Sequence, residues 1–116
     1  MPLIESYSFG SIRIAGNTFH RDVILLGDDV LSPWFRQAGG HVFAPEDLEP
    51  VIRSAPEIVV LGTGAFGRVR VNDLTIAALR EAGADVVVER TKQAVSEYNA
   101  LLTAGRNAAA ALHLTC

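Results

Sequence analysis

Short apolar runs alternate with segments of helical periodicity through the second half of this chain, and this alternation most constrains its fold. Residues 58–61 and 86–88 are continuous apolar runs, as expected of strands whose two faces are both covered. Helices are predicted at 72–83 and at 91–105, where Thr91 can serve as the N-cap. This order predicts parallel strands joined by crossover helices.

The first third has the pattern of hairpins instead. Residues 11–14 alternate polar and apolar side chains, and 23–26 form a short apolar run before a turn. Asp47 can cap a short helix after this region. The tail at 107–114 is rich in alanine, which favours helix, but an alternating chain is expected to finish on a strand. We therefore predict an N-terminal β-hairpin region followed by an α/β sheet with parallel crossovers, most simply in three layers.

Composition sets the class of protein. The 116 residues, 49% of them apolar, suit a single domain spanning 1–116 with a hydrophobic core. A net charge of −3 argues against binding to nucleic acid or to an anionic membrane. With one cysteine, no signal peptide and no apolar run long enough to span a bilayer, we expect a soluble cytoplasmic protein without membrane insertion.

A glycine motif, Gly62-Thr63-Gly64-Ala65-Phe66-Gly67, follows the apolar run at 58–61. It matches the dinucleotide-binding pattern, and Glu89 lies 22 residues after Gly67, close to the position of a ribose-binding acid. However, helix signals begin only near Asn72, so the helix N-terminus is displaced from the place where it would meet a pyrophosphate. We therefore expect no cofactor.

Two interpretations of the glycines stay open. In the structural one, they let the backbone turn sharply off a buried strand. In the functional one, the loop borders a crevice at the carboxyl ends of neighbouring strands, where free N–H groups and a guanidinium would bind a small anion. The residues of this predicted crevice are Gly62, Thr63, Gly64, Gly67, Arg68, Glu89 and Thr91.

No residue pattern indicates catalysis or metal binding. His20, His41 and His113 are far apart in sequence and, with Cys116, lack metal-ligand spacing, so neither catalytic residues nor metal ligands are assigned. Trp34 and Phe35 are adjacent and cannot both easily face inward. With Phe43 and Phe66 they are candidates for an exposed apolar patch that binds a partner, the alternative being core packing.

Several short motifs recur in the order found in a known family. They are Phe9-Gly10-Ser11-Ile12-Arg13-Ile14, Asp22-Val23-Ile24-Leu25, Trp34, Asp47-Leu48, Leu61-Gly62-Thr63-Gly64, Thr91 with Ala94, Tyr98-Asn99, and Ala111-Leu112-His113-Leu114-Thr115-Cys116. Together they resemble the small domain family that includes the mitochondrial complex I assembly factor 3 and the adipogenesis-associated domain protein. The resemblance implies a three-layer α/β/α fold with a central mixed sheet and an added β-hairpin element, and it supplies no catalytic residue.

The leading prediction is a non-enzymatic accessory or assembly-type protein that acts through contacts with a protein partner of unknown identity. It depends on the resemblance, on the lack of a catalytic set and on the Trp34-Phe35 pair. The alternative is a small-molecule or anion-binding domain, possibly an enzyme, that uses the Gly62–Gly67 loop.

Overall fold

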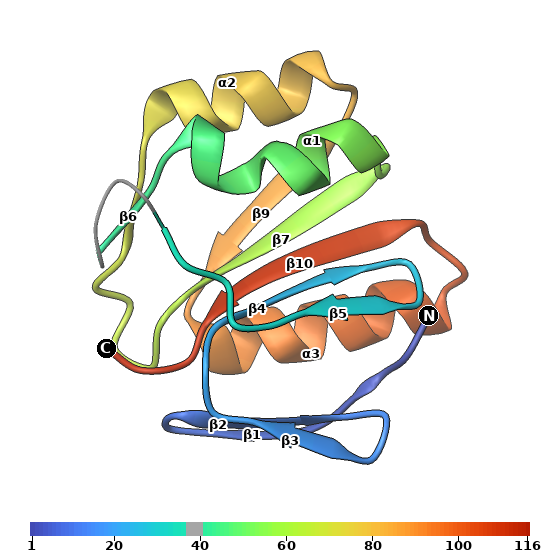
Figure 1. The fold of residues 1–116 in the computed structure, drawn as a ribbon. Helices are drawn as coiled ribbons and strands as arrows, with labels where there is room; N and C mark the ends of the chain where they lie inside the picture. Colours follow the sequence, from blue (N-terminus) through green and yellow to red (C-terminus); the bar gives the residue numbers. More distant parts are fainter. Residues whose placement is uncertain (37–40) are drawn as a thin grey trace.

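The computed structural model describes residues 1–36 and 41–116 (Figure 1). The described helices are the 3-10 turn η1 (Pro45–Leu48), α1 (Glu49–Ser54), α2 (Asp73–Glu81) and α3 (Thr91–Thr103). The strands are β1 (Ile4–Ser8), β2 (Ser11–Ile14), β3 (Asn17–Phe19), β4 (Val23–Leu26), β5 (Asp29–Leu31), β6 (Val42–Phe43), β7 (Ile58–Thr63), β8 (Arg70–Val71), β9 (Asp85–Glu89) and β10 (Ala108–His113).

A five-stranded mixed sheet in the order β5-β4-β10-β7-β9 forms the centre of the molecule. The C-terminal strand β10 lies in its middle, parallel to β7 and antiparallel to β4. The chain runs from β7 through α2 to β9, then returns through α3 to β10 on the other side of β7. Because such crossovers are right-handed, reversing direction places α2 and α3 on opposite faces of the sheet (Figure 1).

The layers are those of an α/β/α sandwich with an added antiparallel sheet. Helices α1 and α2 cover one face, while α3 and the three-stranded sheet β1-β2-β3 cover the other (Figure 1). The predicted fold class, with a central mixed sheet, parallel crossovers and an N-terminal hairpin region, is confirmed. The pair β6-β8, parallel and two residues long in each strand, was not predicted.

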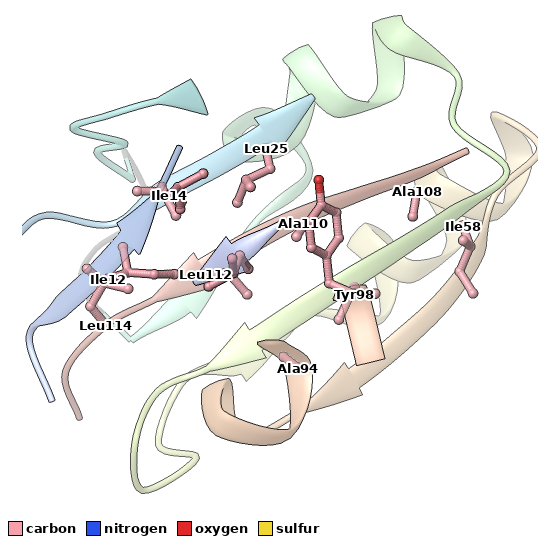
Figure 2. Close-up of a cluster of buried hydrophobic side chains, with 13 residues drawn as sticks. Ile12, Ile14, Leu25, Ile58, Ala94, Tyr98, Ala108, Ala110, Leu112 and Leu114 are labelled. Carbon is pink, nitrogen blue, oxygen red and sulfur yellow. The ribbon is translucent and has the colours of Figure 1, made fainter. Parts of the chain in front are cut away.

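Successive residues of β10 point to opposite faces and so divide between two cores. Ala108 and Ala110 pack with Tyr98 of α3 on one face (Figure 2), and Ala109 and Ala111 pack against the other cluster. Alanines leave room over the central strand for the large Tyr98 ring, which is fully buried. The helix-forming alanines are therefore strand residues because tertiary burial outweighs their intrinsic propensity.

Two predicted caps differ from the structure. Asp47 is not the N-cap of a helix: it lies within the 3-10 turn, and its side chain accepts a hydrogen bond from the Ala44 N–H at 3.1 Å. Thr91 is the first residue of α3, after the N-cap Arg90, and its hydroxyl bonds elsewhere. At α2 the prediction holds, since Asn72 is the N-cap and accepts from the Leu74 N–H at 2.9 Å.

Candidate functional site

The carboxyl ends of the parallel strands lie together at one edge of the central sheet. His113 at the end of β10 pairs with Thr63 at the end of β7, and Gly62 pairs with Glu89 at the end of β9. Strands 58–61 and 85–88 are therefore neighbours, as the crevice prediction required. The C-terminal residues 114–116 leave β10 at this same edge.

Thr91 joins the glycine loop to the end of β10. Its buried hydroxyl donates to the His113 carbonyl oxygen at 2.6 Å and accepts from the Gly64 N–H at 2.8 Å. Gly62 lies so close that a Cβ there would be 2.8 Å from Leu112 Cδ2 and 3.0 Å from Thr91 Oγ1. Gly62 lies within β7 and has no left-handed backbone angle, so glycine is favoured at this position by close packing and not by a turn.

The amide groups of the glycine loop hydrogen-bond to the C-terminal segment. Ala65 N donates to the Thr115 carbonyl oxygen at 2.6 Å, and Phe66 N and Arg68 N donate to the Cys116 carbonyl oxygen at 3.3 and 3.2 Å. Gly64 has a φ of +103°, and a Cβ there would be 2.3 Å from the Cys116 carbonyl carbon. This geometry favours the structural interpretation of the glycines, and ligand binding by the loop stays a prediction.

The other predicted crevice residues have local roles. Gly67 has a φ of +67° and packs against the Arg90 side chain. The Arg68 guanidinium lies over the Phe66 ring, 5.8 Å from its centroid. Glu89 accepts a hydrogen bond from Thr63 Oγ1 through its carbonyl oxygen at 3.1 Å.

Trp34 and Phe35 point in different directions. Trp34 is only 8% exposed, donates from Nε1 to the Asp47 carbonyl oxygen at 3.0 Å and packs on the buried Phe43 ring. Phe35 is 73% exposed. Trp34 and Phe43 are thus core residues and not parts of an exposed patch, which corrects half of the sequence interpretation.

Three exposed phenylalanines belong to segments that adjoin the C-terminal segment; we call Phe9, Phe35 and Phe66 the phenylalanine surface. Phe9 and Phe66 are each 58% exposed, and their ring centroids are 6.0 Å apart. Gly10, next to Phe9, donates to the Leu114 carbonyl oxygen, and Phe66 donates to that of Cys116. Phe35 lines a pocket together with Leu114 and Thr115.

A buried polar cluster, which sequence reasoning missed, lies beside this surface. Asp22 Oδ2 contacts Arg36 Nη1 at 2.5 Å and His113 Nδ1 at 2.7 Å, and Asp22 Oδ1 accepts from the Leu114 N–H at 2.9 Å. The Arg36 side chain is 5% exposed and lies over the Trp34 and Phe43 rings. Asp22 thus links the start of β4 to the end of β10 and to the segment after β5.

The hydrogen bonds of this cluster keep Asp22 ionised. Burial by itself raises the pKa of Asp22, but the hydrogen bonds from His113, Arg36 and the Leu114 N–H outweigh it, so its pKa lies below the ordinary value. The short contact with an ionised carboxylate requires a proton on His113 Nδ1. On the other side of the ring, His113 Nε2 lies 3.3 Å from the Thr115 hydroxyl oxygen, within hydrogen-bond distance. His113 Nε2 can therefore serve as a hydrogen-bonding atom for a polar group of a ligand.

The cluster forms the floor of a pocket of about 310 Å³. Its lining residues are His20, Arg21, Asp22, Trp34, Phe35, Arg36, His113, Leu114 and Thr115. In the sequence, the available signal was a polar residue at the border of each of two apolar strands, Asp22 and His113. That signal becomes informative only once β4 and β10 are known to be antiparallel neighbours.

In the described ranges, 1–36 and 41–116, no group of three or more His, Cys, Asp or Glu side chains is arranged to hold a metal ion. None of the helices in these ranges is long and apolar enough to cross a membrane.

Fold and site together define a small α/β/α domain with a buried Asp–Arg–His cluster at the carboxyl edge of its mixed sheet. A family model described as "Protein of unknown function (DUF498/DUF598)" matches residues 4–113, and the chain belongs to this family. The resemblance noted from the sequence is thereby confirmed.

Known proteins similar to this chain include one curated relative and several solved structures. The mouse protein named NADH dehydrogenase [ubiquinone] 1 alpha subcomplex assembly factor 3 is 34% identical over 94% of this chain, which spans 58% of that relative's length. The solved structure of MT938 has a TM-score of 0.84 and 27% identity, with both chains fully covered. A protein from Bartonella henselae, described as an outer membrane protein, has a TM-score of 0.85 and 24% identity over 99% of this chain and 96% of that one, which shows the fold alone.

Proposed function

We propose that this protein is a non-enzymatic accessory protein that acts in the cytoplasm through contacts with another protein. The observation that carries the proposal is the phenylalanine surface. Large exposed aromatic side chains that gather around one segment are typical of partner sites, because burying them on association removes apolar area from water. Phe9 and Phe66, on different elements but 6.0 Å apart, supply the centre of that surface.

The comparison with known proteins supports an accessory role. The mouse relative carries the name of an assembly factor. Because this chain spans 58% of that relative, the identity of the complex is not transferred with the role. The partner is therefore proposed by its chemistry: an apolar surface complementary to exposed aromatic rings.

Ligand binding at the glycine loop is the weaker alternative. An anion site of the predicted kind needs backbone N–H groups that point at the ligand. The N–H groups of Gly64, Ala65, Phe66 and Arg68 instead donate to oxygen atoms of Thr91, Thr115 and Cys116. A ligand there would have to compete with these bonds.

Affinity capture from the native cells tests the proposal with matched variants. Phe66→Ser removes a 58% exposed residue from the phenylalanine surface. The control, Leu74→Ser, removes a 68% exposed residue from the first turn of α2, outside that surface. We expect the unmodified chain and Leu74→Ser to retain the same specific partner and Phe66→Ser to lose it. A partner retained equally by both variants contradicts the proposal.

A further inference from the structure

We infer that the pocket above Asp22 and His113 is a binding site for a small organic anion, a carboxylate or phosphate joined to a planar apolar body. This site is distinct from the glycine loop, and it does not depend on the proposed partner contacts. It shares only Phe35 with the phenylalanine surface. The inference depends on which polar groups of the pocket are already used and which are not.

The floor of the pocket is electrostatically satisfied. The Asp22 carboxylate is engaged by Arg36, His113 and the Leu114 N–H, so its charge is balanced within the protein. A cationic ligand would therefore have to break these bonds to reach the carboxylate. The floor presents instead the polar edge formed by His113 Nε2 and Thr115 Oγ1.

The rim carries a cationic group, Arg21, whose side chain is not engaged by any residue of the described part of the chain. Arg21 is exposed, lines the pocket, and forms no side-chain ion pair or hydrogen bond with any residue in the described ranges. His20, beside it on the rim, is exposed and likewise has none there. The planar, positively charged guanidinium matches the geometry of a carboxylate or phosphate. The ligand is therefore expected to carry a negative charge.

The walls specify the rest of the ligand. The exposed Phe35 and the small exposed part of Trp34 supply aromatic lining, and Leu114 adds an apolar group. A volume of about 310 Å³ lies at the small end of the range for ligand pockets and suits one ring with an anionic substituent. The cationic rim, the aromatic lining and the polar floor therefore all favour the same ligand class, an aromatic ring that carries an anionic group.

Trp34 is the only tryptophan of the chain, so its fluorescence reports on this pocket directly. The probes are benzoate, phenyl phosphate, benzyl alcohol as the neutral analogue, and inorganic phosphate as the anion without a ring, all at constant ionic strength. We expect saturable changes with benzoate or phenyl phosphate, and binding about tenfold weaker or more for benzyl alcohol and inorganic phosphate. If benzoate binds more tightly, the preferred anionic group is a carboxylate; if phenyl phosphate does, it is a phosphate.

Matched variants separate recognition from general charge effects. Arg21→Gln should raise the Kd of the ring-bearing anions about tenfold, whereas Arg80→Gln, an exposed arginine of α2, should leave it within twofold. Both positions are exposed, so the fold is retained in each, and circular dichroism verifies this. Absence of saturable binding, equal affinity for benzyl alcohol, or equal effects of the two variants would overturn the inference. None of these results bears on capture of a protein partner by Phe66.

Discussion

Asp22 and His113 are 91 residues apart in the chain, yet Asp22 Oδ2 and His113 Nδ1 lie 2.7 Å from each other. The contact exists because β4 and β10 are antiparallel neighbours, which brings the start of one strand beside the end of the other. Through Arg36 and the Leu114 N–H, the same carboxylate holds the segment after β5 and the C-terminal segment. The carboxyl edge of the sheet is therefore fixed by one buried charge network.

Asp22→Asn should destabilise the protein by about 3 kcal/mol, because it leaves the buried Arg36 guanidinium without its carboxylate. Chemical denaturation at neutral pH measures the loss in the free energy of unfolding. The control is Asp29→Asn, at an exposed carboxylate of β5, which should change it by less than about 0.5 kcal/mol. Equal values for the two variants would show that the cluster contributes nothing to stability.

The same carboxylate predicts a dependence on pH. The folded-state pKa of Asp22 is lowered, so its contribution is present in full above the unfolded-state pKa of about 4 and is lost as pH falls through the folded-state value. Unfolding free energies measured between neutral and acid pH should fall less steeply for Asp22→Asn than for the unmodified chain. Parallel curves would contradict the network described here.

Thr91→Val should cost about 2 kcal/mol, since it removes the hydroxyl that bonds Gly64 N and the His113 carbonyl oxygen in a buried site. Thr91→Ser keeps the hydroxyl and loses one methyl group, so it should cost about 1 kcal/mol. Thermal denaturation of both variants measures the difference. If Thr91→Ser is the more damaging, the methyl group matters more than the hydrogen bonds.

Gly64→Ala should destabilise by at least about 3 kcal/mol, because its φ is +103° and the new Cβ would be 2.3 Å from the Cys116 carbonyl carbon. Gly83→Ala isolates the two causes. Its φ is +95°, but no atom lies within 4 Å of the added Cβ, so it should cost only the backbone strain of about 1–2 kcal/mol. Similar losses in denaturant titrations would mean that the C-terminal segment does not pack on Gly64.

Tyr98→Phe should leave stability unchanged or raise it by about 1 kcal/mol. The Tyr98 hydroxyl is buried in the core shown in Figure 2, and none of the described residues provides it with a hydrogen-bond partner. Burial raises the pKa of Tyr98 to about 12, so the hydroxyl is neutral and its removal costs no charge interaction. A loss above about 1 kcal/mol in thermal denaturation would reveal a partner, such as a buried water.

Local patterns predicted the elements whose determinants are close in sequence. The strand–helix unit is determined by the apolar run of β7, the Asn72 cap and the left-handed Gly83. Each of these signals can be recognised from a few consecutive residues of the sequence. Thr91 shows the limit of such reasoning. A threonine before a helical pattern suggests an N-cap, but its hydroxyl goes to Gly64 and His113, which become neighbours only in the folded sheet.

The candidate site was harder to predict from the sequence than the fold, because its contacts also join residues that are distant in the chain. Trp34 and Phe35 are adjacent and similar in hydrophobicity, and the direction of each depends on whether Asp47 and Phe43 lie beneath it. The Asp22–His113 contact depends on strand order, which the sequence leaves open because β10 inserts between β4 and β7. The sequence shows which side chains are charged or aromatic, but not which of them contact one another in the folded protein.

Site-specific photo-crosslinking in the native cells tests the proposed partner contact most directly. A photoreactive phenylalanine analogue is placed at position 66 in the phenylalanine surface, or at position 74 on the exposed side of α2 as the control. The account predicts a covalent adduct of one defined mass from position 66, with the same partner identified from position 9, and none from position 74. Equal adducts at positions 66 and 74, or no adduct at position 66, would contradict it.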